Sequence, residues 1–141
     1  MFDPIVDVVF SEDMSFELPD EMRDTAFMGE PGIAFTLAGA GEYLNDPRLK
    51  EAATVLGDRV AERLAQAEHP SPDYLTGQVG AAALLLGYDL ADDREALLGV
   101  LDRHAQDIIA GRVEEEWWSH SGFAHGISAS IFALSRWNQQ M

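Results

Sequence analysis

The sequence predicts an all-α protein built from α/α repeats: three helical hairpins stacked into a curved arc or a closed ring. Three observations support this prediction. Two segments have the apolar period of half-exposed helices, three others are small and apolar on nearly every side, and the repeat that contains these three begins at Gly29, Gly77 and Gly126, 48 and then 49 residues apart. A repeat of this length, with one buried and one amphipathic helix per unit, is typical of stacked helical hairpins.

The two amphipathic segments are residues 47–66 and 92–109. Asp46 and Pro47 favour a helix start at the first, as N-cap and first helical residue, and Gly111 is placed to end the second. Each segment carries one apolar face and is predicted to be an outer, half-exposed helix. The apolar positions are Leu49, Ala52, Ala53, Leu56, Val60 and Leu64 in the first, and Leu97, Leu98, Leu101, Ala105, Ile108 and Ile109 in the second.

The three buried segments are residues 32–44, 77–86 and 126–134, which we interpret as inner helices. Each opens on a pair of small residues with the same spacing. Because glycine lets two backbones approach closely, we interpret these pairs as packing features. The pairs are Gly29 with Gly32, Gly77 with Gly80, and Gly126 with Ala129.

The chain divides into two parts where the helical repeats begin. Residues 1–28 contain prolines and many acids, and are predicted to be an irregular or docking N-terminal arm; residues 29–141 form the helical-repeat domain. Residues 5–10 are rich in valine and fit either a strand or a docking arm. The sequence alone does not decide between the two.

The composition restricts the function. The chain has 25 acidic and nine basic residues and a formal charge of -16, so nucleic acid and anionic membranes are not expected as partners. A cationic or neutral peptide would be tolerated, although an acidic surface also serves solubility. Cysteine is absent, which excludes disulfides and thiolate catalysis. No long apolar run is present, and a cytoplasmic protein is expected.

Two residues could carry chemistry. Asp73 and His125 each precede a buried helix, so side-by-side hairpins would bring them to one cavity, where an acid and an imidazole can transfer protons near neutral pH. The alternative is that Asp73 is a cap and His125 a hydrogen-bonded histidine at a helix start. His104 is expected to be structural and His69 to be solvated in its loop. The spacing of the histidines does not favour a metal site.

At these residues the sequence resembles the lanthionine synthetase C-like family, the cyclases of lanthipeptide biosynthesis. The resemblance covers about residues 27–137 and depends on the order of two motifs, Asp73-Tyr-Leu-Thr-Gly77-Gln-Val-Gly80 and Gly122-Phe-Ala-His125-Gly126-Ile-Ser. It implies a toroid of inner and outer helices, of which this chain is about half, with Asp73 and His125 as the catalytic pair. We expect five flanking residues to contact the substrate: Tyr74, Trp117, Trp118, His120 and Phe123. Aromatic residues beside a site suit peptide binding, although a tryptophan can also cap the bundle.

The chain differs from the family in its expected metal site. The zinc ligands of the family come from a later half of the ring, so neither a metal nor another cofactor is expected here. Zinc stabilises a thiolate, whereas an amine nucleophile needs only proton transfer. The leading hypothesis is therefore a metal-free peptide cyclase that forms a crosslink such as lysinoalanine in a dehydrated precursor peptide. The others are a non-catalytic module that holds a precursor for a separate lanthipeptide synthetase, and a degenerate paralogue.

The arc also predicts association. Open arcs of repeats leave apolar flanks exposed unless they are capped or paired, and the inner helix at 126–134 carries several large apolar residues. We expect a homodimer to cover this flank. The main competitor is the N-terminal arm, which could fold back onto the same surface.

Overall fold

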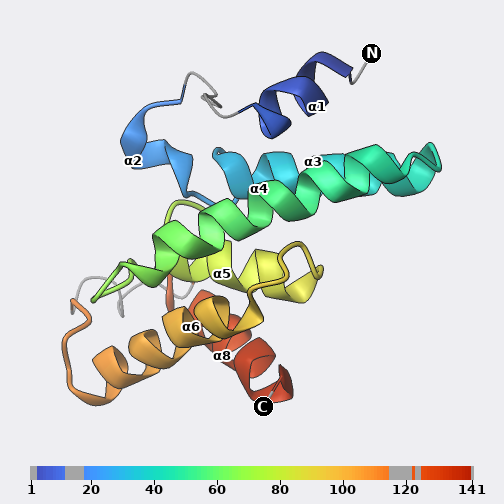
Figure 1. Ribbon diagram of the computed structural model, residues 1–141. Helices are drawn as coiled ribbons and strands as arrows, with labels where there is room; N and C mark the ends of the chain where they lie inside the picture. The colour runs from blue at the N-terminus through green and yellow to red at the C-terminus, as the bar shows by residue number, and fades with distance from the viewer. Residues whose placement is uncertain (1–2, 12–17, 115–121, 123–124, 141) are drawn as a thin grey trace.

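The computed structural model describes residues 3–11, 18–114, 122 and 125–140. Every regular element in these ranges is a helix, which confirms the predicted all-α class. Figure 1 shows the hairpin of α3 and α4 stacked on that of α5 and α6, with α8 beside the second. The elements are α1 Asp3–Phe10, α2 Asp20–Arg23, α3 Glu30–Tyr43, α4 Pro47–Ala65, α5 Gln78–Gly87, α6 Arg94–Ile109 and α8 Ile127–Gln140.

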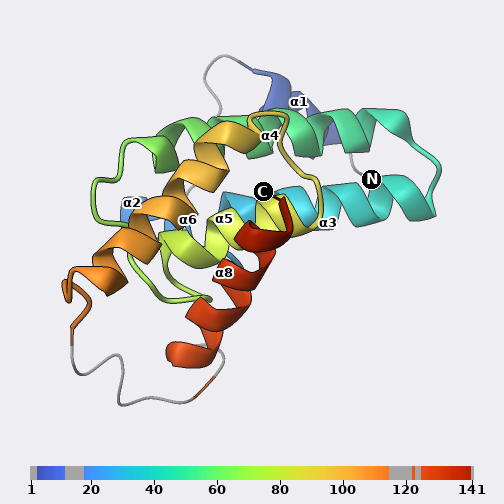
Figure 2. The same ribbon diagram turned by 90° about the horizontal axis from the view of Figure 1, so that it is seen from below.

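The long helices form two layers. α3 pairs with α4 and α5 pairs with α6, while α5 also contacts α3 on one side and α8 on the other. The outer helices α4 and α6 contact each other, and α8 closes against α5 and α6 (Figure 2). The inner layer is therefore α3, α5 and α8, and the outer layer is α4 and α6, as the repeat pattern predicts.

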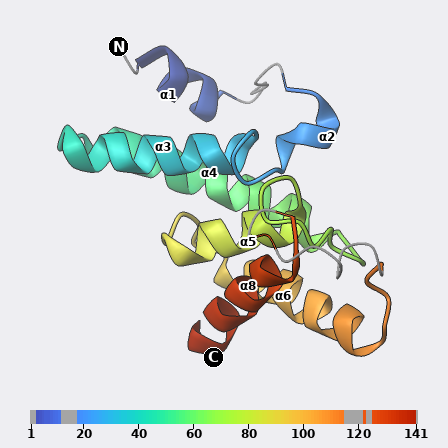
Figure 3. The same cartoon turned by 180° about the vertical axis from the view of Figure 1, so that it is seen from behind.

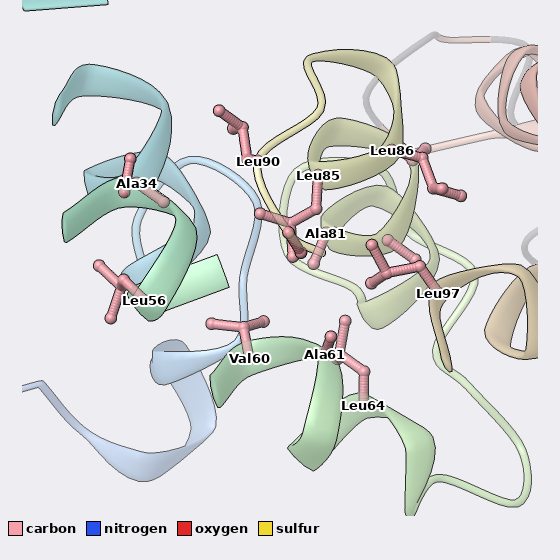
Figure 4. Close-up of a cluster of buried hydrophobic side chains, with 14 of the residues drawn as sticks. Ala34, Leu56, Val60, Ala61, Leu64, Ala81, Leu85, Leu86, Leu90 and Leu97 are labelled. Carbon is pink, nitrogen blue, oxygen red and sulfur yellow. The ribbon is translucent and has the colours of Figure 1, made fainter. Parts of the chain in front are cut away.

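Apolar side chains from both layers fill one continuous core. Figure 4 shows Val60 and Leu64 of α4 in the same cluster as Leu85 of α5 and Leu97 of α6, and all four are buried. This cluster joins the first hairpin to the second, so the repeats form one unit. Among the helices described, none is long and apolar enough to cross a membrane.

The starts of the outer helices follow from their caps. Asp46 accepts a hydrogen bond from the Arg48 N–H at 3.0 Å, with Pro47 in the first turn. Asp93 accepts from the Ala96 N–H at 3.0 Å and so begins α6. The six apolar positions predicted for α4 are all buried.

The predicted face of α6 is wrong by about one position. Its buried residues are Leu97, Val100, Leu101, His104 and Asp107, whereas Ile109 is 85% exposed. The helix points His104 and Asp107 inward because each has a polar partner there, with Ser130 for the first and Arg112 for the second. Partnered polar groups can occupy a buried stripe that an apolar count assigns elsewhere.

The inner helices differ in burial. α5 is buried on nearly every side, as predicted, because α3 and α8 flank it. The expectation is wrong for α3 and α8, which each leave a face open. Phe35 of α3 is 39% exposed and Ile131 of α8 is 63% exposed. In the part of the chain described here, each of these helices has an inner neighbour on one side only.

The glycine pairs serve close backbone approach, as the repeat suggests. A Cβ at Gly80 would collide with the carbonyl oxygen of Tyr74, and one at Gly32 would lie 3.0 Å from that of Ala26. Both oxygens belong to the residue six positions earlier, in the loop that leads into the helix. The loop enters the helix in the same way in both repeats.

The described part of the N-terminal arm contains two short helices, α1 and α2. Residues 5–10 belong to α1, so the strand alternative is wrong, and the arm docks on the outer face of the first hairpin. Val6 and Val9 are buried, and the Arg59 guanidinium of α4 donates to the Val9 carbonyl at 2.7 Å. Figure 3 shows α1 on the opposite side of the molecule from α8. The proposed folding of the arm onto the last inner helix is therefore not observed.

Candidate functional site

Asp73 stands in the loop that leads into α5. Its Oδ1 accepts hydrogen bonds from the Leu75 and Thr76 N–H groups at 2.8 and 2.7 Å. Gly77, rather than Asp73, is the N-cap of α5. Asp73 therefore caps the preceding turn, and this use occupies only one of its two oxygens.

The second oxygen meets His125. Oδ2 of Asp73 and Nδ1 of His125 form a hydrogen bond between the entrances of α5 and α8, although the residues are 52 positions apart in the chain. The Asp73 side chain is 17% exposed and the imidazole 59% exposed. The structure therefore brings the two predicted residues together at an open surface, while their catalytic roles remain predictions.

The surroundings favour an ionised Asp73. Burial by itself would raise the pKa of Asp73, but the Thr76 N–H and the His125 imidazole outweigh burial and hold the pKa below its ordinary value. A fixed carboxylate on Nδ1 sets the orientation of the ring and leaves Nε2 for proton exchange. Such a pair can act as a general base or, when protonated, as a general acid.

A hollow of about 370 Å³ adjoins Asp73. Its lining includes a second carboxylate and imidazole pair, His69 with Asp107, whose Nδ1 and Oδ1 atoms are 3.1 Å apart. Asp107 also accepts from Arg112 Nε at 2.6 Å. His69 is 57% exposed, as expected for a solvated loop residue, and its imidazole is in addition held to Asp107 of α6.

Tyr74 belongs to the core. Its side chain is 6% exposed and lies between two rings, with centroid distances of 6.2 Å to Phe27 and 5.6 Å to Phe132. Burial raises the pKa of Tyr74. The residue thus supports the loop that carries Asp73, and the predicted contact with a peptide stays a prediction. The other residues of that set, Trp117, Trp118, His120 and Phe123, lie outside the described residues.

A comparison with protein families matches this architecture. The model of the lanthionine synthetase C-like protein family covers residues 11–141. The chain belongs to this family. No curated protein and no solved structure matches the chain. Membership of the lanthionine synthetase C-like family relates the chain to lanthipeptides and to modified peptide substrates.

The residues do not fit the zinc ion that the resemblance to this family implies. The chain has no cysteine, and within the described ranges no three His, Asp or Glu side chains gather into a group that could hold a metal. Softer thiolate ligands, which zinc sites commonly use, are thus absent from the sequence.

Sequence reasoning missed the pair of His69 and Asp107. One signal was present: Asp107 follows His104 by three positions on the inward stripe of α6, where an acid needs a partner. The sequence does not say which partner it finds, because His69 comes from a loop 38 positions earlier.

Proposed function

We propose that the protein is a peptide cyclase that adds an amine of a dehydrated precursor peptide across a dehydroalanine-type double bond. The hydrogen bond between Asp73 and His125 carries this proposal. It joins two loop residues from different repeats at an exposed position, and core packing does not require such an arrangement. Lysinoalanine is one crosslink of this kind.

The chemistry needs two proton movements. An ammonium group loses one proton, its lone pair attacks Cβ of the double bond, and the electron pair moves to the neighbouring carbonyl as an enolate. A proton delivered to Cα completes the addition, so one hydrogen moves in total from nitrogen to carbon. His125 delivers this proton from Nε2, while Asp73 holds Nδ1 and steadies the charged ring.

The test uses two substitutions that preserve shape. His125→Asn keeps a donor where Nδ1 stands but removes Nε2, and Asp73→Asn keeps the oxygen that caps the turn. Each should lower the rate of crosslinking about 100- to 10,000-fold with little change in the unfolding midpoint. The assay is mass-spectrometric detection of an amine-linked ring in a dehydrated, lysine-containing peptide. Normal turnover by both variants would reject the proposal.

A non-catalytic peptide-binding module for a separate lanthipeptide synthetase is the second candidate. Two observations favour it: the charge of -16, which suits a basic peptide, and the exposed apolar side chains in the loop before α3, where Phe27 is 52% and Met28 49% exposed. Binding of the dehydrated peptide without any conversion, unchanged by His125→Asn, would favour this module. A cytoplasmic location fits either candidate.

A further inference from the structure

We propose that the hollow beside Asp73 receives the amine of the peptide, and that His69 is the catalytic residue that accepts its proton. This inference rests on the proposed function and deepens it. Conjugate addition of an ammonium group needs one proton acceptor and one proton donor, and His125 supplies only one of them.

His69 shares a loop with Asp73, the residue that holds His125. His69 and Asp73 lie on the same loop and line the same hollow of about 370 Å³. That loop is held in place by the Val79 N–H, which donates to the Ser71 carbonyl at 3.1 Å, and by the Gln78 side chain, which accepts from the Ser71 N–H at 3.2 Å. His69 and Asp73 are therefore placed by the same anchoring at the start of α5.

His69 is held as a reacting histidine would be. Its Nδ1 lies 3.1 and 3.2 Å from the two oxygens of Asp107, whose side chain is only 8% exposed. The imidazole itself is 57% exposed. Asp107 is held in turn by Arg112. The Nδ1 side of the His69 ring therefore has a fixed partner, and its Nε2 side faces the open surface. Asp107 acts here as a positioning residue.

The charges around the hollow suit an ammonium ion. Three carboxylates line it, from Asp73, Asp107 and Glu114, against one guanidinium, from Arg112. Glu68 adds another carboxylate, with Oε1 4.0 Å from Nε2 of His69. An amine drawn to these groups lies next to His69, and this proximity assigns proton acceptance to His69 and proton delivery to His125.

The step balances with these two residues. Nε2 of His69 takes one proton from R–NH3+, and the resulting R–NH2 forms a bond from nitrogen to Cβ while the double bond opens to the enolate. His125 then gives one proton to Cα. The product is a secondary ammonium ion, and exchange with water returns both imidazoles to their starting forms.

The first experiment compares His69→Asn with His69→Ala in the crosslinking assay. Asn keeps a donor to Asp107 but has no counterpart of Nε2, whereas Ala loses both. If His69 accepts the proton, both variants lose about 100-fold in kcat. If His69 only anchors the loop, the Asn variant keeps its activity and only the Ala variant is impaired, which would overturn the inference while the proposed function stands.

The second experiment does not depend on turnover. Diethyl pyrocarbonate modifies exposed histidines, and mass spectrometry reads the rate at His69 separately from that at His125. A short synthetic peptide with one lysine and one dehydroalanine should slow modification of His69 several-fold, while the same peptide with norleucine in place of lysine should not. Equal rates with both peptides would overturn the amine hollow, even for an enzyme that is active. A wild type that binds the peptide but forms no crosslink would instead reject the proposed function.

Discussion

His104 of α6 and Ser130 of α8 hydrogen-bond to each other inside the core. His104 is fully buried and Ser130 is 2% exposed. This bond ties the outer helix of the second repeat to the inner helix whose entrance carries His125. It explains how a histidine is accommodated in the core, and it agrees with the structural role that the sequence predicts for His104.

The first prediction is a loss of stability between pH 6.5 and 4. Burial, which outweighs the attraction of Asp107, lowers the pKa of His104 from 6.5 to about 4. Below pH 6.5 the unfolded chain therefore binds a proton that the folded chain refuses, and the free energy of unfolding falls as the pH falls. The loss reaches at most about 3 kcal/mol. Urea titrations at pH 7 and 5 should show it for the wild type, and a smaller one for His104→Gln. If the free energy of unfolding fell equally with pH in both proteins, the loss could not be assigned to His104.

The second prediction concerns a buried ion network that apolar patterning does not reveal. Glu30 is 2% exposed and pairs with Arg63 of α4, which also donates to Asp24 at 2.7 and 2.9 Å. Among the described ion pairs, Arg63→Met would leave Glu30 with that to Arg23, whose Nε is 3.7 Å away. Since Arg63 keeps 33% of its side chain exposed, we expect a destabilisation of about 2 to 3 kcal/mol, below that of a fully buried pair.

The control for the ion network is Arg48→Met, which removes an exposed arginine that pairs with Asp46 at 2.9 Å. The backbone N–H that Asp46 caps is unchanged in this variant. Surface pairs of this kind contribute little. Chemical denaturation should therefore separate the two variants clearly, and equal losses would show that the network around Glu30 is unimportant.

The third prediction uses two glycines in the inner helices. Gly80→Ala would place a methyl group against the Tyr74 carbonyl, so the loop that carries Asp73 must shift, at a loss of about 1 to 3 kcal/mol. At Gly39 of α3 a Cβ would meet nothing within 4 Å. Gly39→Ala should instead stabilise the helix by about 0.5 to 1 kcal/mol. Thermal unfolding should show a lower midpoint for Gly80→Ala and a higher one for Gly39→Ala. A neutral Gly80→Ala would show that the junction is loose.

The sequence was sufficient for the fold wherever local chemistry decides the structure. The start of α4 follows from Asp46 and Pro47, and its buried stripe from apolar period alone. It was also sufficient for the meeting of Asp73 and His125, because the loops that enter neighbouring inner helices lie side by side in stacked hairpins. These features depend on residues close in sequence or on the repeat itself.

The remaining features depend on contacts between distant segments. The register of α6 is set by Ser130 and Arg112, which satisfy His104 and Asp107 on its inward side. The helical state of residues 5–10 depends on docking against α4, because an isolated helix of eight residues is not stable in water. The local sequence pattern shows neither the partners of α6 nor the docking of α1 on α4. It likewise does not show that His69 pairs with Asp107.

The last prediction begins with Ile131. This residue of α8 is 63% exposed, whereas Ala34 and Ala82, at the equivalent positions of α3 and α5, are fully buried. The repeat alignment thus places a large apolar side chain at a position that the other two repeats cover. Within the described residues the arm lies elsewhere, because α1 docks on α4. A large apolar residue in this position suits an interface between two chains.

We therefore expect a homodimer in which two copies cover each other's α8, since two-fold association is the commonest closed arrangement. Light scattering at micromolar concentration should give the mass of two 15.5 kDa chains. Ile131→Glu should return the protein to the mass of one chain without unfolding it, because the side chain is exposed within one copy. Tyr43→Glu is the matched control: this residue is 90% exposed at the end of α3, away from α8, and the change should leave the mass unaltered. A wild type that scatters as a single chain would reject the dimer, and the hollow beside Asp73 would then have to act within one copy.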